Sequence, residues 1–99
     1  MIVTATRISV RPEKRTELDQ TIGGLVEEMN ETRPKVIFRH YVDAADANTY
    51  LLLAEWESEA DLDDYLGSEE FAILRGAISL LSTRSVDFTA VITSQAVRR

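Results

Sequence analysis

The chain has 99 residues, of which 44% are hydrophobic and 28% are charged, and its net charge at pH 7 is −6. This length fits one domain over residues 1–99, and the composition is that of a soluble globular protein without a stretch long enough to span a membrane. The acidic balance argues against nucleic acid as a partner, and the absence of cysteine excludes disulfides, thiolate nucleophiles and cysteine-ligated zinc.

The first ten residues alternate apolar and polar side chains, and they lack the apolar run and small-residue cleavage site of a secretory signal. We therefore expect a cytoplasmic protein. The same alternation predicts a strand over residues 2–9. Its even-numbered residues face one side of the strand, and its odd-numbered residues, including Arg7, face the other.

A first helix is predicted from residue 13 to about residue 31, because Pro12 suits a first helical turn and the apolar residues that follow recur at helical spacing. Gly23 and Gly24 lie inside this pattern, where each costs about 1 kcal/mol of helix stability relative to alanine. Close packing against the sheet is the expected compensation. Pro34 then ends the helical pattern.

Two strands are predicted next, over residues 35–42 and 48–57, with the polar segment 43–48 as the turn between them. Ser58 follows the second of these strands, and Asp61 lies three residues later. This spacing is typical of a helix N-cap, in which the serine side chain binds backbone N–H groups of the first turn. A helix is therefore expected to begin directly after the strand.

Gly67 and Ser68 interrupt this second helical pattern, and Ser68 is placed to cap a further helix. Beyond it the apolar residues again recur on one helical face, before the pattern changes to alternation. A fourth strand is predicted over residues 84–93. The tail, residues 94–99, is expected to be loose.

The predicted order is strand, helix, strand, strand, helix, strand, which is the ferredoxin-like βαββαβ arrangement of an α+β protein with a four-stranded antiparallel sheet. The third strand is apolar on both sides, with Leu51 and Leu53 on one side and Trp56 on the other. Helices cover only one face of such a sheet. We therefore expect a second copy of the chain to cover the other face, since two-fold pairs are the commonest assemblies; the alternative is a monomer with an exposed apolar sheet.

The chain resembles the antibiotic biosynthesis monooxygenase (ABM) domain family in residues 50–58 (Tyr-Leu-Leu-Leu-Ala-Glu-Trp-Glu-Ser) and in Leu62, Tyr65, Leu66, Ser68 and Phe71. The resemblance extends over nearly the whole chain. It implies a dimeric α/β barrel in which two sheets face each other and each subunit holds a pocket between its sheet and its helices. The members of this family include cofactor-independent oxygenases of anthrones and quinols and heme-degrading enzymes.

The heme-degrading members use an asparagine, a tryptophan and a histidine, whose corresponding positions here are Thr6, Tyr65 and Arg75. Because none of the three is retained, the chain has no obvious axial ligand for heme iron at that place. The quinol-oxidising members often carry histidine where this chain has Tyr65. The resemblance therefore implies neither a cofactor nor a metal.

A cofactor-free oxygenase must bind a flat, electron-rich phenol or enol, assist its deprotonation, stabilise the anion and exclude water while oxygen reacts. Trp56 and Tyr65 are the candidates for the wall of the pocket, and Arg7 or Arg75 for the group that stabilises the anion. His40 is the candidate base, because histidine is the side chain that titrates near neutrality. We predict His40 and Arg7 as catalytic residues, and Trp56, Tyr65 and Arg75 as substrate-binding residues.

Each of these residues also has a structural interpretation. A tryptophan at a strand end is more often a core residue than a substrate wall, which favours a structural role for Trp56. His40 shares a strand side with Phe38, which fits a histidine satisfied in a core or an interface. Arg75 is also placed to pair with Glu70 or Asp61 on a solvated helix face.

Arg7 lies on a central strand, where an arginine that points inward requires a carboxylate or a ligand as its partner. Tyr41 and Tyr50 are expected to pack across adjacent strands. The leading hypothesis is a homodimeric, cofactor-independent monooxygenase of a small aromatic, anthrone or quinol-type molecule. The alternative is a non-catalytic module of the same dimeric fold that binds a small ligand, and a purely structural assembly subunit comes third.

Overall fold

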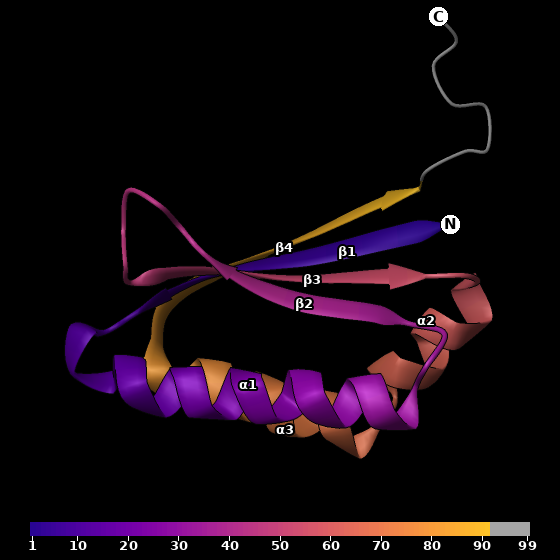
Figure 1. The fold of residues 1–99 in the computed structure, drawn as a ribbon, viewed down its shortest axis with the longest axis horizontal. Helices are drawn as coiled ribbons and strands as arrows, with labels where there is room; N and C mark the ends of the chain where they lie inside the picture. Colours follow the sequence, from indigo (N-terminus) through magenta and orange to yellow (C-terminus); the bar gives the residue numbers. More distant parts are fainter. Residues whose placement is uncertain (92–99) are drawn as a thin grey trace, which may run out of the picture.

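The computed structural model describes residues 1–91, which form a four-stranded antiparallel sheet packed against a layer of helices (Figure 1). The elements in chain order are β1 (Ile2–Val10), the 3₁₀ helix η1 (Pro12–Lys14), α1 (Arg15–Thr32), β2 (Ile37–Val42), β3 (Thr49–Trp56), α2 (Glu59–Leu66), α3 (Glu69–Leu81) and β4 (Ser82–Val91). The predicted ferredoxin-like α+β fold is confirmed. The predicted end of the fourth strand, at residues 92–93, and the tail lie outside the described residues.

The strands lie in the order β2-β3-β1-β4, and each pair of neighbours is antiparallel. β1 is therefore central, with β3 on one side and β4 on the other. Thr6 of β1 lies opposite Leu52 of β3 and Asp87 of β4. Residues that lie opposite one another in such a ladder share a face of the sheet, so this register brings side chains from distant parts of the chain together.

The helix ends follow local chemistry that is visible in the sequence. The side chain of Ser58 accepts a hydrogen bond from the backbone N–H of Asp61 at 3.2 Å, and that of Ser68 accepts one from Phe71, also at 3.2 Å. Both predicted N-caps are confirmed, and each contributes about 1 kcal/mol. The first helix differs from its prediction, because Pro12 opens a separate 3₁₀ turn and α1 begins only at Arg15.

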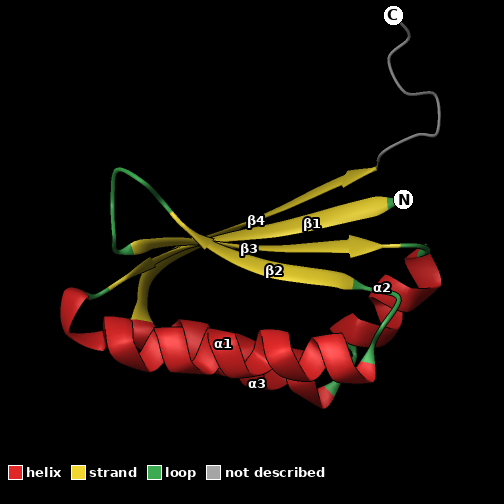
Figure 2. Ribbon diagram, in the orientation of Figure 1, coloured by secondary structure: helices red, strands yellow, loops and turns green. Residues whose placement is uncertain are grey.

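The core lies between the sheet and the helices. Its largest fully buried side chains come from β1, β3 and α1: Ile8, Tyr50, Trp56, Leu18, Ile22 and Met29. The strand residues among them have even numbers, as the period of a strand requires for one buried face. Figure 2 shows that the three α-helices lie on this side of the sheet.

Gly23 and Gly24 do not pack closely against the sheet, contrary to our prediction. A Cβ atom added at either residue would meet no other heavy atom within 4 Å, so both sites have open space. The two glycines therefore weaken α1 without a compensating contact in the described residues. Their effect on helix stability is offset by the buried apolar stripe of α1.

The outer face of the sheet, meaning the side away from the helices, carries Val3, Ala5, Arg7, Ile37, Tyr41, Leu51, Leu53, Val86 and Phe88. Within residues 1–91 no element covers this face, and Tyr41 and Phe88 are 47% and 53% exposed. The predicted two-sided apolar character of β3 is thus confirmed. None of the described helices is both long and apolar enough to cross a membrane.

Candidate functional site

A cavity of about 190 Å³ lies between the helix-facing side of the sheet and the helices α2 and α3. Most of its lining is apolar and includes Phe38, Leu52, Ala54, Leu62, Leu66, Phe71 and Leu74. The polar lining consists of Thr4, Thr6, Tyr65, Asp87 and Thr89. Asp87 and Thr89 are exposed on the edge strand β4, so the cavity opens to solvent beside that strand. This combination of an apolar wall and a few grouped polar side chains is typical of a small-molecule site.

Tyr65 lies at the centre of an aromatic cluster against this cavity. Its ring centroid is 5.0 Å from that of Trp56, 5.3 Å from that of Phe71 and 6.0 Å from that of Phe38. Leu62 and Tyr65 are the buried residues of α2, and the Ser58 cap fixes where that helix starts. The sequence therefore directs Tyr65 toward the sheet through helix periodicity and one N-cap.

Trp56 supports this cluster from within the core. Its side chain is 1% exposed, and its Nε1–H donates a hydrogen bond to Oγ1 of Thr4 at 2.9 Å. Trp56 is not among the residues that line the cavity in the described chain, whereas Tyr65 and Thr4 are. Trp56 therefore contacts two lining residues but not the cavity itself, which agrees with its interpretation as a core residue.

The hydroxyl of Tyr65 is buried and has no hydrogen-bond partner within residues 1–91. Burial raises the pKa of this hydroxyl from 10.0 to about 12, because the charged phenolate would lose its contact with water. The guanidinium of Arg33, which lies 5.7 Å from the ring centroid, acts in the opposite direction on this pKa but with a smaller effect.

This shift predicts a loss of stability at high pH that depends on Tyr65. Between pH 10 and about 12 the unfolded chain loses the hydroxyl proton while the folded chain keeps it, so the free energy of unfolding falls as the pH rises. The shift corresponds to about 2–3 kcal/mol. We expect Tyr65→Phe to be at least as stable as the original protein at pH 8, and more stable than it at pH 11.5. Urea unfolding at both pH values measures the difference, and an equal loss in both proteins would contradict it.

Asp87 holds a polar network at the open side of the cavity. Its Oδ1 accepts a hydrogen bond from Oγ1 of Thr6 at 2.8 Å, and Nη1 of Arg75 lies 3.3 Å from both carboxylate oxygens. Arg75 also lies over the ring of Phe71, with its guanidinium carbon 6.0 Å from the centroid. The partner of Arg75 is therefore Asp87 on β4, and not Glu70 or Asp61 as its structural interpretation supposed.

The sequence pattern did not indicate Asp87 as a site residue. The available signal was an aspartate within the apolar alternation of the fourth strand, on the same side as Ser85 and Thr89. A carboxylate on one side of a strand that is otherwise suited to packing requires a polar partner or solvent. That partner, Thr6, becomes identifiable only once β4 is paired with β1.

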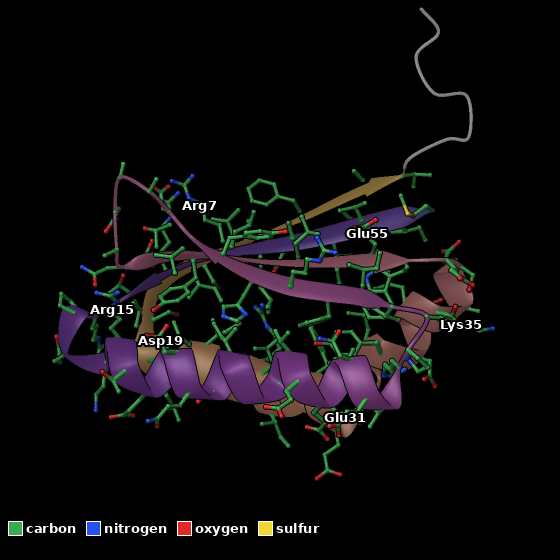
Figure 3. The ribbon with its side chains drawn as sticks, in the orientation of Figure 1. Arg7, Arg15, Asp19, Glu31, Lys35 and Glu55 are labelled. Carbon is green, nitrogen blue, oxygen red and sulfur yellow. The ribbon has the colours of Figure 1, made fainter. Side chains whose placement is uncertain are left out.

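His40 and Arg7 lie apart from the cavity. His40 faces the helix side of the edge strand β2 but is exposed, and it is not among the described residues that line the cavity. Arg7 is exposed on the outer face, and Figure 3 shows it pointing away from the helices. It does not point inward. The structure thus places Tyr65 in the cavity wall with Trp56 behind it. Arg75 is not among the described lining residues, but it contacts two of them, Asp87 and Phe71. His40 and Arg7 lie elsewhere.

A second polar contact joins α1 to the sheet at the other end of the molecule. The buried Tyr50 donates its hydroxyl hydrogen to Asp19, which points from α1 toward the sheet (Figure 3). Burial, followed by the hydrogen bond with Asp19, raises the pKa of Tyr50. Tyr50 lies opposite Val42, whereas Tyr41 lies opposite Leu51 on the outer face. The two tyrosines therefore do not pack together across the strands, contrary to our expectation.

Comparison with known proteins gives a consistent family and fold. The sequence profile of the antibiotic biosynthesis monooxygenase family matches residues 1–74. A crystal structure described as an antibiotic biosynthesis monooxygenase has a TM-score of 0.81 at 20% identity, covering 94% of this chain and 99% of that one.

Two further solved structures have similar scores. A candidate antibiotic biosynthesis monooxygenase from Deinococcus radiodurans has a TM-score of 0.87 at 13% identity, covering 100% of this chain and 98% of that one. A protein from Mycobacterium tuberculosis has a TM-score of 0.83 at 18% identity, covering 97% of this chain and 98% of that one. No match was found among curated protein sequences. At these identities the structural likeness establishes the fold, and the profile match identifies the family.

Proposed function

Because the chain belongs to the antibiotic biosynthesis monooxygenase family, we propose that it oxidises a small aromatic, anthrone or quinol-type molecule with molecular oxygen and without a cofactor. Family and fold support a monooxygenase-type or small-molecule-binding role. The observation that carries the more specific proposal is the apolar cavity beside Tyr65, with the ion pair of Arg75 and Asp87 at its open side. Such a cavity keeps water from a flat substrate while leaving one edge of it next to charged groups.

The proposed reaction takes its electrons from the substrate. In an anthrone, a CH₂ carbon loses its two hydrogens and gains a double bond to one oxygen atom of O₂. In a hydroquinone, one ring C–H becomes C–OH and both hydroxyl groups lose their hydrogens, which leaves a hydroxyquinone. In either case the second oxygen atom leaves as water with the two hydrogens that the substrate lost, so the substrate gives up four electrons.

The reaction requires that the substrate lose a proton before it reacts with oxygen, and that the resulting anion be stabilised. Arg75 is the proposed anion-stabilising residue, because its guanidinium lies beside the cavity-lining Asp87 and Phe71. Tyr65 is the proposed aromatic wall, and Trp56 holds it in place. His40 as base and Arg7 as a second cationic group remain predictions that variants must test.

Oxygen consumption against a panel of hydroquinones and anthrones tests the proposal. We expect the protein to consume oxygen with at least one of them, and Arg75→Ala to lower that rate by about 100-fold, as the loss of one anion-stabilising donor does elsewhere. His40→Ala and Arg7→Ala test the predicted base and the second cation. Arg39→Ala, which removes another arginine of the sheet surface, is the matched control. Oxygen consumption that is equal in all four variants would contradict the proposed site.

A non-catalytic module that binds a small ligand is the second candidate. The observation that favours it is the position of His40 and Arg7, neither of which lines the cavity in the described residues. This candidate predicts that aromatic ligands bind to the cavity while no member of the panel consumes oxygen. Binding and oxygen consumption measured on the same compounds therefore separate the two functions.

We further propose that two copies pair through the outer face. Its apolar residues come from all four strands, and large contiguous apolar surfaces on soluble proteins usually mark interfaces. In a two-fold pair each copy covers the outer face of the other. Most of the cavity lining lies on the opposite side of the sheet, and only Ala5, Leu53 and Phe88 of the outer face also border the cavity. We therefore expect pairing to leave the open side next to β4 accessible.

A further inference from the structure

The polar side of the cavity is organised in two rows across strands β1 and β4. Thr4 lies opposite Thr89 in one row, and Thr6 lies opposite Asp87 in the other. All four residues line the cavity, whereas most of its other lining residues are apolar. Along each strand the two rows are two residues apart, and a strand rises about 3.4 Å per residue, so the rows are separated by about 7 Å. This distance is roughly the width of one aromatic ring together with its two oxygen substituents.

The Asp87 row accepts hydrogen bonds. An ionised carboxylate offers about four acceptor positions, and within the described chain Thr6 and Arg75 occupy positions on it. Thr6 uses its hydroxyl hydrogen on Asp87, so that hydrogen is not available to a ligand. A ligand group that contacts this row from inside the cavity must therefore donate the hydrogen bond itself. The ligand is therefore expected to bind in its neutral form, because a group that is already ionised when it enters this row is repelled by the carboxylate. In the proposed reaction the proton leaves only after binding, and Arg75 then lies near the anion.

The Thr4 row donates hydrogen bonds. The indole Nε1–H of Trp56 donates to Oγ1 of Thr4 at 2.9 Å, and an indole nitrogen is only a donor. Thr4 must therefore be the acceptor in that bond, which leaves its own hydroxyl hydrogen free. No contact in residues 1–91 uses this hydrogen. Thr4 can donate it to an oxygen atom of a ligand in the cavity.

We propose that Asp87 and Thr4 are the residues that select and orient the ligand of this cavity. A neutral, flat molecule donates a hydroxyl hydrogen to Asp87 at one edge and accepts the hydroxyl hydrogen of Thr4 on an oxygen at the opposite edge. An engineered cavity of about 150 Å³ holds benzene, so the cavity here, at about 190 Å³, fits a ligand of one or two rings. The inference rests on the proposed function in placing the ligand in the same cavity, but it does not depend on turnover.

Binding under anaerobic conditions tests the inference with four probes that differ only at their substituents. The probes are 1,4-dihydroxynaphthalene, 4-methoxy-1-naphthol, 1,4-dimethoxynaphthalene and 1-naphthoate, titrated against the fluorescence of the single tryptophan and confirmed by calorimetry. We expect the two probes with a free hydroxyl to bind at least tenfold more tightly than the dimethoxy compound. The naphthoate is expected to bind most weakly, because its carboxylate would lie beside Asp87.

Two variants assign the two ends of the ligand. Asp87→Asn is expected to reduce the preference for a free hydroxyl over a methoxy group to less than threefold and to improve binding of 1-naphthoate. Thr4→Val is expected to weaken all three oxygen-substituted neutral probes about tenfold while leaving the preference for hydroxyl unchanged. Ser85→Ala is the matched control, because Ser85 lies on the same side of β4 as Asp87 but is not among the described residues that line the cavity. Circular dichroism confirms that each variant is folded.

The outcomes separate this inference from the proposed function. Equal affinity of the original protein for the hydroxyl and dimethoxy probes, or a preference that survives in Asp87→Asn, would overturn the inference even if oxygen is consumed. Failure of every probe to bind would overturn it as well. Selective binding that disappears in Asp87→Asn without any oxygen consumption would support the inference and overturn the monooxygenase proposal.

Discussion

Replacement of Trp56 by alanine is expected to lower the free energy of unfolding by about 3–5 kcal/mol, the usual cost of removing a fully buried aromatic side chain. Trp56 is 1% exposed and packs on Tyr65 at 5.0 Å between ring centroids. The substitution also removes the hydrogen bond to Thr4. Because small domains have only about 5–15 kcal/mol of stability in total, this loss is large. Urea unfolding followed by circular dichroism, at a fixed protein concentration, measures it.

Trp56→Phe is the matched control for this prediction. It keeps an aromatic ring in the core and removes the indole N–H, so we expect a smaller loss of about 1–2 kcal/mol. If Trp56→Ala instead lost less than about 1 kcal/mol of stability while it abolished ligand binding, Trp56 would be a wall of the binding site and not a core residue. The experiment therefore decides between the two interpretations that the sequence left open.

Leu53→Asp is expected to convert the proposed dimer of about 22 kDa, twice the 11.1 kDa of one chain, into a monomer. Leu53 lies near the middle of the outer face, opposite Ala5 of β1 and Arg39 of β2. Two-fold symmetry places two new carboxylates in the interface, and an unpaired buried charge costs several kcal/mol. We expect the dimer to weaken about 1,000-fold or more, as measured by sedimentation equilibrium.

Ile73→Asp provides the control for a new charge on an apolar surface residue. Ile73 is 61% exposed on α3, on the helix layer and therefore away from the outer face, so this variant should remain a dimer. A mass of 11.1 kDa for the original protein at every concentration would refute pairing through the outer face. A dimeric Leu53→Asp variant would place the contact elsewhere on the molecule.

The fold could be predicted from the sequence because its signals are local. Ser58 and Ser68 mark the starts of α2 and α3, and the alternation of apolar and polar residues identifies β1 as a strand. Where local signals compete, the prediction was less accurate. Pro12 suits both a 3₁₀ turn and the first turn of an α-helix, and the structure adopts the former.

The candidate site was predicted only in part, because its polar residues meet through contacts between distant parts of the chain. Thr6 and Asp87 are 81 residues apart in the sequence and are joined by the pairing of β1 with β4. Tyr65 was identified through the family resemblance, at a position that carries tryptophan or histidine in other members. Arg7 was assigned correctly to a side of its strand, but a single chain does not reveal whether the helices or another molecule cover that side.

Strand β4 combines two tasks on its two sides. Its helix-facing residues Ser85, Asp87 and Thr89 contribute to the cavity side, and Val86 and Phe88 contribute to the outer face. A substitution on one side therefore acts mainly on that side, although Phe88 also borders the cavity. Insertion or deletion of a single residue would exchange the two sets, since every later side chain moves to the opposite side. During evolution β4 can change its chemistry one side chain at a time, but we expect its length to be far less free to vary.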